Sequence, residues 1–116
     1  VSETVPSPLE YFGTIIGAPD ILHYTDEIYG YLRALADASP RVRIRSIGAT
    51  EEGRDQIEVI IADEATMQNL QVYHDYLNAL ADPRKISEDE AGESIAKAKT
   101  VYYLTAVLHS PETVSP

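Results

Sequence analysis

Near its carboxyl end the chain carries a histidine and a glutamate three residues apart, in the segment His109-Ser110-Pro111-Glu112. Imidazole nitrogen and carboxylate oxygen are both good ligands for Zn²⁺, and a short loop with this spacing can bring the two to one ion. A catalytic zinc usually has three protein ligands and an open position for water. We therefore predict that His109 and Glu112 are two ligands of a zinc site whose third ligand the spacing does not reveal.

An apolar run from Val101 to Leu108 (VYYLTAVL) leads directly into His109. Continuous runs rich in β-branched and aromatic residues are typical of a strand buried on both faces, inside a sheet that lies between helices. Ligands of such folds bind at the carboxyl ends of the strands. The sequence thus predicts that His109 lies at a ligand-binding edge. Without sheet neighbours, the exposed edge of this strand would favour self-association.

Length and composition limit the partners of the chain. Its 116 residues, 44% of them hydrophobic, suit one small domain with a core. With 19 acidic and 9 basic residues the net charge is −10, which repels phosphate backbones and anionic lipid surfaces, so we expect neither nucleic acid nor membrane as a partner. The chain has no cysteine, so any metal must be bound by His, Asp or Glu.

The first half of the chain predicts one helix and one hairpin. Residues 1–22 contain prolines and glycines and predict an extended, irregular lead-in. A helix capped by Thr25 follows, with apolar residues at helical spacing, and Ser39-Pro40 ends it. Alternating residues over 41–47 and 56–62 predict two antiparallel strands, joined by the glycine-containing loop 48–54.

The second half predicts two further helices before the apolar run. One has its apolar face from Leu70 to Ala81 and ends at Asp82-Pro83. Ser87 and Glu90 match the capping box of the next, and Ala91, Ile95 and Ala98 are predicted to form its inner side. A strand that is apolar on both faces needs more neighbours than these elements offer. We therefore expect residues 23–116 to be the amino-terminal part of a larger domain, truncated at 116.

Other polar groups favour simpler interpretations. His74 lies on the apolar face of a predicted helix and His23 has no ligand partner at a suitable spacing, so neither is predicted to bind metal. The loop containing Glu52-Gly53-Arg54 suits a hairpin turn. The acidic run 88–90 lacks the alternating spacing of a calcium loop and suits the first turn of a helix. No phosphate-loop, nucleophile-elbow or His-Glu-x-x-His motif is present.

Several segments in order resemble the amino-terminal part of the zinc carboxypeptidases, the M14 metallopeptidase family. The match covers most of the chain. The ordered segments are Thr25-Asp26-Glu27-Ile28, Ser39-Pro40-Arg41-Val42, Ile47-Gly48-Ala49-Thr50-Glu51-Glu52-Gly53-Arg54, Ala81-Asp82-Pro83-Arg84 and Leu108-His109-Ser110-Pro111-Glu112.

The resemblance implies a carboxypeptidase-like α/β fold, with a mixed β-sheet between helices, of which this chain is an amino-terminal fragment. It implies a zinc-dependent metallocarboxypeptidase that hydrolyses the last peptide bond of peptides or proteins, with His109 and Glu112 as metal ligands. A second histidine, the catalytic glutamate and the substrate-binding arginines are expected beyond Pro116, so no catalytic residue is expected within the chain. The resemblance also implies a secreted or periplasmic location.

Two alternatives remain open. Many digestive-type members of the family have arginine immediately before the ligand glutamate, whereas this chain has Pro111, which leaves the subfamily undecided. An amidohydrolase, such as a deacylase or a peptidoglycan peptidase, would use the same scaffold. A non-catalytic domain that retains the fold for binding or assembly is the other alternative.

Overall fold

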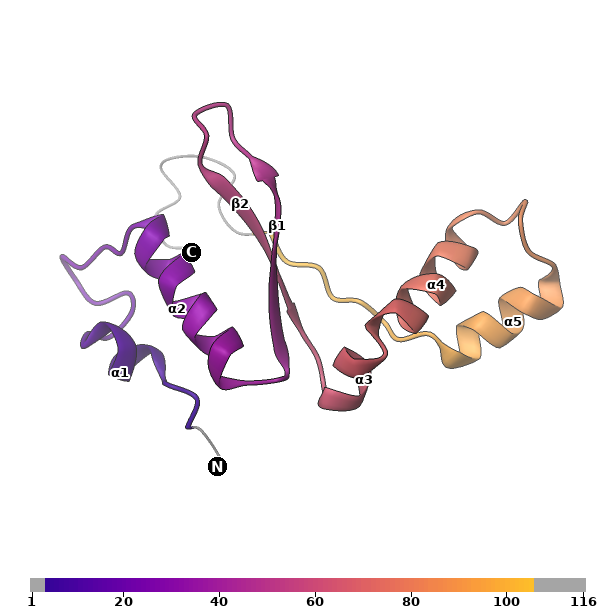
Figure 1. Ribbon diagram of the computed structural model, residues 1–116, viewed down its shortest axis with the longest axis horizontal. Coiled ribbons are helices and arrows are strands. Elements are labelled where there is room, and N and C mark those ends of the chain that lie inside the picture. The colour runs from indigo at the N-terminus through magenta and orange to yellow at the C-terminus, as the bar shows by residue number, and fades with distance from the viewer. Residues whose placement is uncertain (1–3, 106–116) are drawn as a thin grey trace. The chain divides into compact units, whose positions relative to one another are not determined.

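A computed structural model of the chain describes residues 4–105. They form two compact units (Figure 1), which we call the hairpin unit (described residues 4–62) and the helical unit (Asp63–Leu104). Helices and strands occur together, as the predicted α/β class requires, but the sheet within the described residues has two antiparallel strands rather than a larger mixed set. The elements are α1 (Pro8–Phe12), α2 (Thr25–Ala38), β1 (Val42–Ala49), β2 (Asp55–Ile61), α3 (Glu64–Gln68), α4 (Leu70–Ala81) and α5 (Glu88–Lys97).

The hairpin of β1 and β2 confirms the predicted pair of antiparallel strands. Val42 pairs with Ile61 and Ile44 with Val59, so one face of the sheet is apolar. A bulge between Ser46 and Gly48 shifts the register before the turn. The turn closes through hydrogen bonds from the N–H groups of residues 50 and 53 to the carbonyls of residues 54 and 50, at 2.8 and 2.9 Å.

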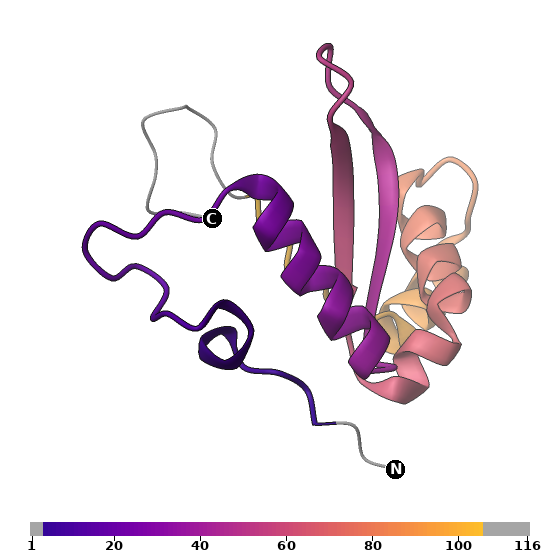
Figure 2. The ribbon, with the colours of Figure 1, turned by 60° about the vertical axis from the view of Figure 1, so that its left-hand side comes forward.

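Helix α2 confirms the first predicted helix and packs against β1 (Figure 2). It begins after Tyr24 rather than after a Thr25 cap: the backbone N–H of Tyr24 donates to the Glu27 carboxylate at 2.8 Å. Its end at Ser39, before Pro40, is as predicted because the residue before proline avoids the helical region.

Helix α1 was not predicted, although its start has a clear local cause. Ser7 accepts a hydrogen bond from the Glu10 N–H, and the Glu10 carboxylate accepts from the Ser7 N–H at 2.7 Å, which is a complete capping box. Pro8 occupies the first helical turn, where its missing N–H costs nothing. Gly13 ends the helix at φ 70°, a left-handed conformation that suits glycine.

The helical unit contains the other two predicted helices, α4 and α5, and one that was not predicted, α3. The capping box of Ser87 and Glu90 is present as expected. The inner side of α5 differs from the prediction: Ser94 is buried, whereas Ile95 is 67% exposed. The three-residue and four-residue steps from Ala91 to Ser94 to Ala98 place small residues on one face, which permits a close approach to α4 and leaves Ile95 outside the contact.

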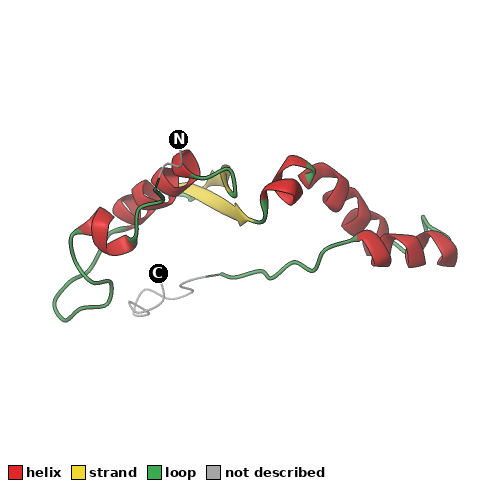
Figure 3. Cartoon of the chain, turned by 90° about the horizontal axis from the view of Figure 1, so that it is seen from below, coloured by secondary structure: helices red, strands yellow, loops and turns green. Residues whose placement is uncertain are grey.

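Few apolar side chains are fully buried in the described residues. Met67 is the one hydrophobic residue there that reaches the buried class, at 4% exposure. After α5 the chain runs as a loop (Figure 3), and residues 101–105 are exposed, with Tyr102 at 87%. The predicted buried strand over 101–108 is therefore wrong for 101–105, because a strand requires hydrogen-bonded neighbours and residues 101–105 have none within the described part of the chain. Residues 106–108 lie outside the described part.

Candidate functional site

The predicted zinc ligands, His109 and Glu112, lie outside the described residues. Within residues 4–105 no group of three His, Cys, Asp or Glu side chains is placed to bind a metal ion. None of the helices in this part of the chain has the length and apolar character needed to cross a membrane. A pocket in the hairpin unit brings several described side chains together.

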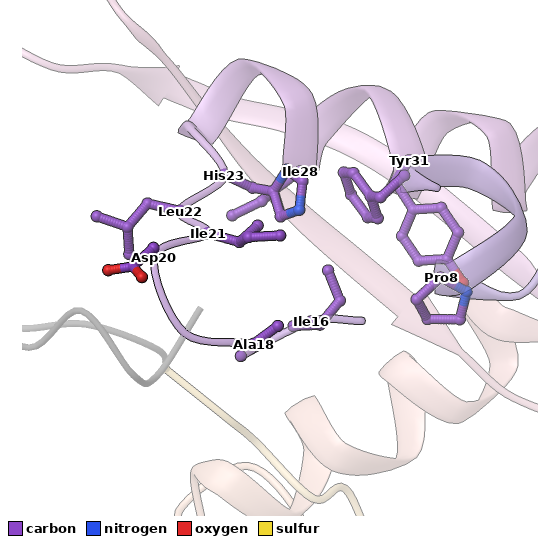
Figure 4. Close-up of a pocket in the computed structure, with 11 residues that line it drawn as sticks. Pro8, Ile16, Ala18, Asp20, Ile21, Leu22, His23, Ile28 and Tyr31 are labelled. Carbon is purple, nitrogen blue, oxygen red and sulfur yellow. The ribbon is translucent and has the colours of Figure 1, made fainter. Parts of the chain in front are cut away.

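That pocket lies between α1, the start of α2 and the loop that joins them (Figure 4), and its volume is about 870 Å³. Figure 4 shows Ile16, Ile21 and Ile28 converging on the space, with Pro8 and Tyr31 opposite them and the Asp20 carboxylate turned away. Its walls are thus mainly apolar. Pockets of this composition accommodate apolar groups and use few polar atoms to orient them.

Aromatic rings close one side of the pocket. The ring centres of Phe12 and His23 are 4.3 Å apart, and those of Phe12 and Tyr31 are 5.4 Å apart. The Tyr31 hydroxyl donates to the carbonyl of Pro6 at 3.0 Å, and Tyr11 packs on Tyr31 at 5.2 Å. These contacts join α1 to α2, so Tyr11 and Phe12 pack over a neighbouring surface.

His23 is the polar group of the pocket with the most defined surroundings. Its Nε2 lies 3.2 Å from Thr14 Oγ1, within hydrogen-bond range, and its Nδ1 lies 3.7 Å from the Glu27 carboxylate. A hydroxyl, an imidazole and a carboxylate in this order resemble a nucleophile activated by a base. The 3.7 Å separation is too long for a hydrogen bond, and the same carboxylate oxygen accepts from Tyr24 at 2.8 Å.

The Glu27 carboxylate therefore caps the first turn of α2. His23 lies between Thr14 of the preceding loop and this first turn. The sequence signal for this arrangement was the four-residue step from His23 to Glu27, which places the two on one side of a helix start. This spacing predicts a contact between His23 and Glu27, but it does not predict the contact between His23 and Thr14. His74, on α4, is half-buried as expected for a histidine on an apolar face.

In the helical unit the charged groups with the clearest geometry are Asp63 and Lys99, 3.0 Å apart. Hydrogen bonds from Thr66, first from its side chain and then from its backbone, together with Lys99, hold the pKa of Asp63 well below its usual range. The pKa of Lys99 is raised, mainly by Asp63. The pair stays fully charged at neutral pH.

No protein-family model, curated protein or solved structure matches this chain.

Proposed function

We propose that the chain is the amino-terminal part of a zinc-dependent metallocarboxypeptidase of the M14 type, in which His109 and Glu112 bind the catalytic zinc. The observation that carries the proposal is the order of elements: α2, then a hairpin whose turn contains Gly53-Arg54, and later an apolar run that leads into His109. This is the order in which the resembling segments occur, and it is hard to obtain from unrelated short motifs.

The distribution of apolar surface supports a larger carboxypeptidase-like domain around the chain. Met67 alone among the described hydrophobic residues is buried, while Ile61 at the end of β2 is 70% exposed and Val101 to Leu104 are each at least 66% exposed. Apolar surface on this scale marks contact sites in folded proteins. Further strands and helices of a mixed sheet would cover it.

The donor chemistry of the two ligands fits zinc. Bound zinc lowers the pKa of a coordinated water and polarises the scissile carbonyl. In this proposal the chain binds the ion through the His109 imidazole and the Glu112 carboxylate. Both groups must be deprotonated to bind it. We therefore expect metal affinity to fall at acidic pH, because protonated imidazole and carboxyl groups do not bind the ion.

Ligand variants of the full-length protein encoded by the gene provide the test. His109→Ala and Glu112→Ala should each lose bound zinc, measured by plasma mass spectrometry, and should release no carboxyl-terminal residue from a peptide, measured by mass spectrometry. His74→Ala and the exposed Glu93→Ala are matched controls that should retain both. Full zinc content in both ligand variants would exclude this site.

The chain by itself should bind zinc much more weakly than a complete site and should cleave no peptide, because two ligands leave the ion poorly held. Stoichiometric binding at nanomolar zinc would contradict this expectation. Parallel assays of the parent with peptides, N-acylated amino acids and peptidoglycan peptides distinguish the carboxypeptidase from the amidohydrolase alternatives. A non-catalytic domain would act on none of them.

A further inference from the structure

The helical unit brings the two ends of its own chain together. Asp63 comes two residues after the end of β2, and Lys99 comes two residues after the end of α5. Between them lie all three helices of the unit, yet the Lys99 ammonium nitrogen is 3.0 Å from Asp63 Oδ2. The residues where the chain enters and leaves the helices thus form a direct ion pair across 36 positions of sequence.

Hydrogen bonds from Thr66 order the Asp63 side chain independently of Lys99. It caps α3: its Oδ1 accepts from the Thr66 N–H at 2.9 Å, and its Oδ2 accepts from the Thr66 hydroxyl at 2.5 Å. The main cost of a surface ion pair is the entropy of ordering two side chains. Because the capping hydrogen bonds already order the Asp63 side chain, the ion pair loses less conformational entropy when it forms.

Lys99 makes a second contact that orients it. Its ammonium group lies 5.3 Å from the centre of the Tyr73 ring on α4, within the range of a cation–π interaction. The side chains of Lys99 and Asp63 are 47% and 52% exposed, respectively, so water and salt screen the pair. The resulting contact is specific but modest in strength, which suits a role in placing a segment rather than in stabilising a core.

We propose that Asp63 and Lys99 form a clasp that holds the exit of the helical unit beside its entry, and so positions the residues that follow the clasp, Thr100 to Leu104. Both are proposed as positioning residues, and neither is proposed as a metal ligand or a catalytic residue. The inference goes beyond the proposed function and does not depend on it. The clasp itself can be tested without metal.

The test uses the whole chain, which contains no cysteine, with Glu64→Cys and Thr100→Cys introduced beside the two clasp residues. Both sites are exposed. The measured quantity is the effective concentration of the two thiols, obtained from disulfide formation in glutathione buffers. Lys99→Met retains the side-chain stem without the charge, and Asp63→Asn retains a capping side chain without the charge. Each should lower the effective concentration by about threefold, the scale of an exposed ion pair, and Lys99→Arg should restore it.

Circular dichroism should show the same helix content in all these variants, which separates a loosened clasp from a loss of folding. Unchanged effective concentrations in both Lys99→Met and Asp63→Asn would overturn the proposal. A failure of zinc binding at His109 would leave these values unaltered. The clasp and the zinc site can therefore fail independently of each other.

Discussion

Truncation of Met67 should destabilise the helical unit more than any single change to its surface. Met67 is 4% exposed, so Met67→Ala removes nearly the whole buried side chain. Complete burial of a methionine contributes about 1.5–3 kcal/mol, and a residual cavity increases the loss to about 2–5 kcal/mol. The other described apolar side chains are only partly buried, so the surroundings of Met67 can close around the space. We therefore expect a value near the lower end, about 2 kcal/mol.

Urea unfolding followed by circular dichroism at 222 nm would measure this loss, since α3, α4 and α5 contribute much of the helix signal. Met67→Leu, which nearly conserves volume, should cost less than about 1.5 kcal/mol. Val72→Ala on α4 removes an apolar side chain that is 46% exposed and should cost clearly less than Met67→Ala. Equal losses for Met67→Ala and Val72→Ala would refute the conclusion that Met67 is the centre of this unit.

Three further predictions concern local structure. Ser87→Ala removes the cap of α5 and should lower the free energy of unfolding by about 1 kcal/mol, with Ser87→Thr as the control; an unchanged urea midpoint would contradict the capping box. Hydrogen bonds from the Ser87 backbone and side chain lower the pKa of Glu90 below 4.5. The stabilisation by the Glu90 carboxylate is therefore complete above about pH 4.5 and is lost as the pH falls through the lowered pKa. Thermal unfolding at pH 3 to 6 should show this loss of stability, and the loss should be smaller in Glu90→Gln. Gly53 has φ 78°, and a Cβ at this position would meet no other atom within 4 Å, so Gly53→Ala should cost about 1 kcal/mol through backbone strain alone. By contrast, Gly92→Ala within α5 should stabilise the protein by about 1 kcal/mol. Thermal shifts of the same sign in the two variants would disprove the conclusion that only Gly53 needs a positive φ.

The elements that the sequence predicted correctly have strong local causes. Helices α2 and α4 combine apolar residues at helical spacing with a proline just beyond their ends, and α5 begins with a capping box. The hairpin follows from alternating residues on either side of a loop whose Gly53 adopts a positive φ. Each of these signals acts within a few residues, so a single sequence is enough to recognise it.

The failures arose where the outcome depends on short signals or on distant contacts. Helices α1 and α3 have five residues each, too few for an amphipathic period, although their caps at Ser7 and Asp63 were visible in the sequence. The position of Ile95 depends on which face of α5 meets α4. Whether the run from Val101 becomes a strand depends on neighbours far away in sequence, which local patterns do not specify.

The same reasoning applies to the candidate site and to how a substrate carboxylate would be recognised. His109 and Glu112 can be proposed as ligands because they are close in sequence, and this proposal stays untested by the described residues, whereas a third ligand from a distant strand would have no local signature. With a net charge of −10, the chain repels a peptide carboxylate unless cations are placed beside the proposed zinc site. In the described residues several arginines already face carboxylates, in the pairs Arg33 with Asp55, Arg45 with Glu58, Arg54 with Glu52 and Arg84 with Asp82. Under the proposed function, recognition of a substrate carboxylate therefore requires cations other than these four paired arginines.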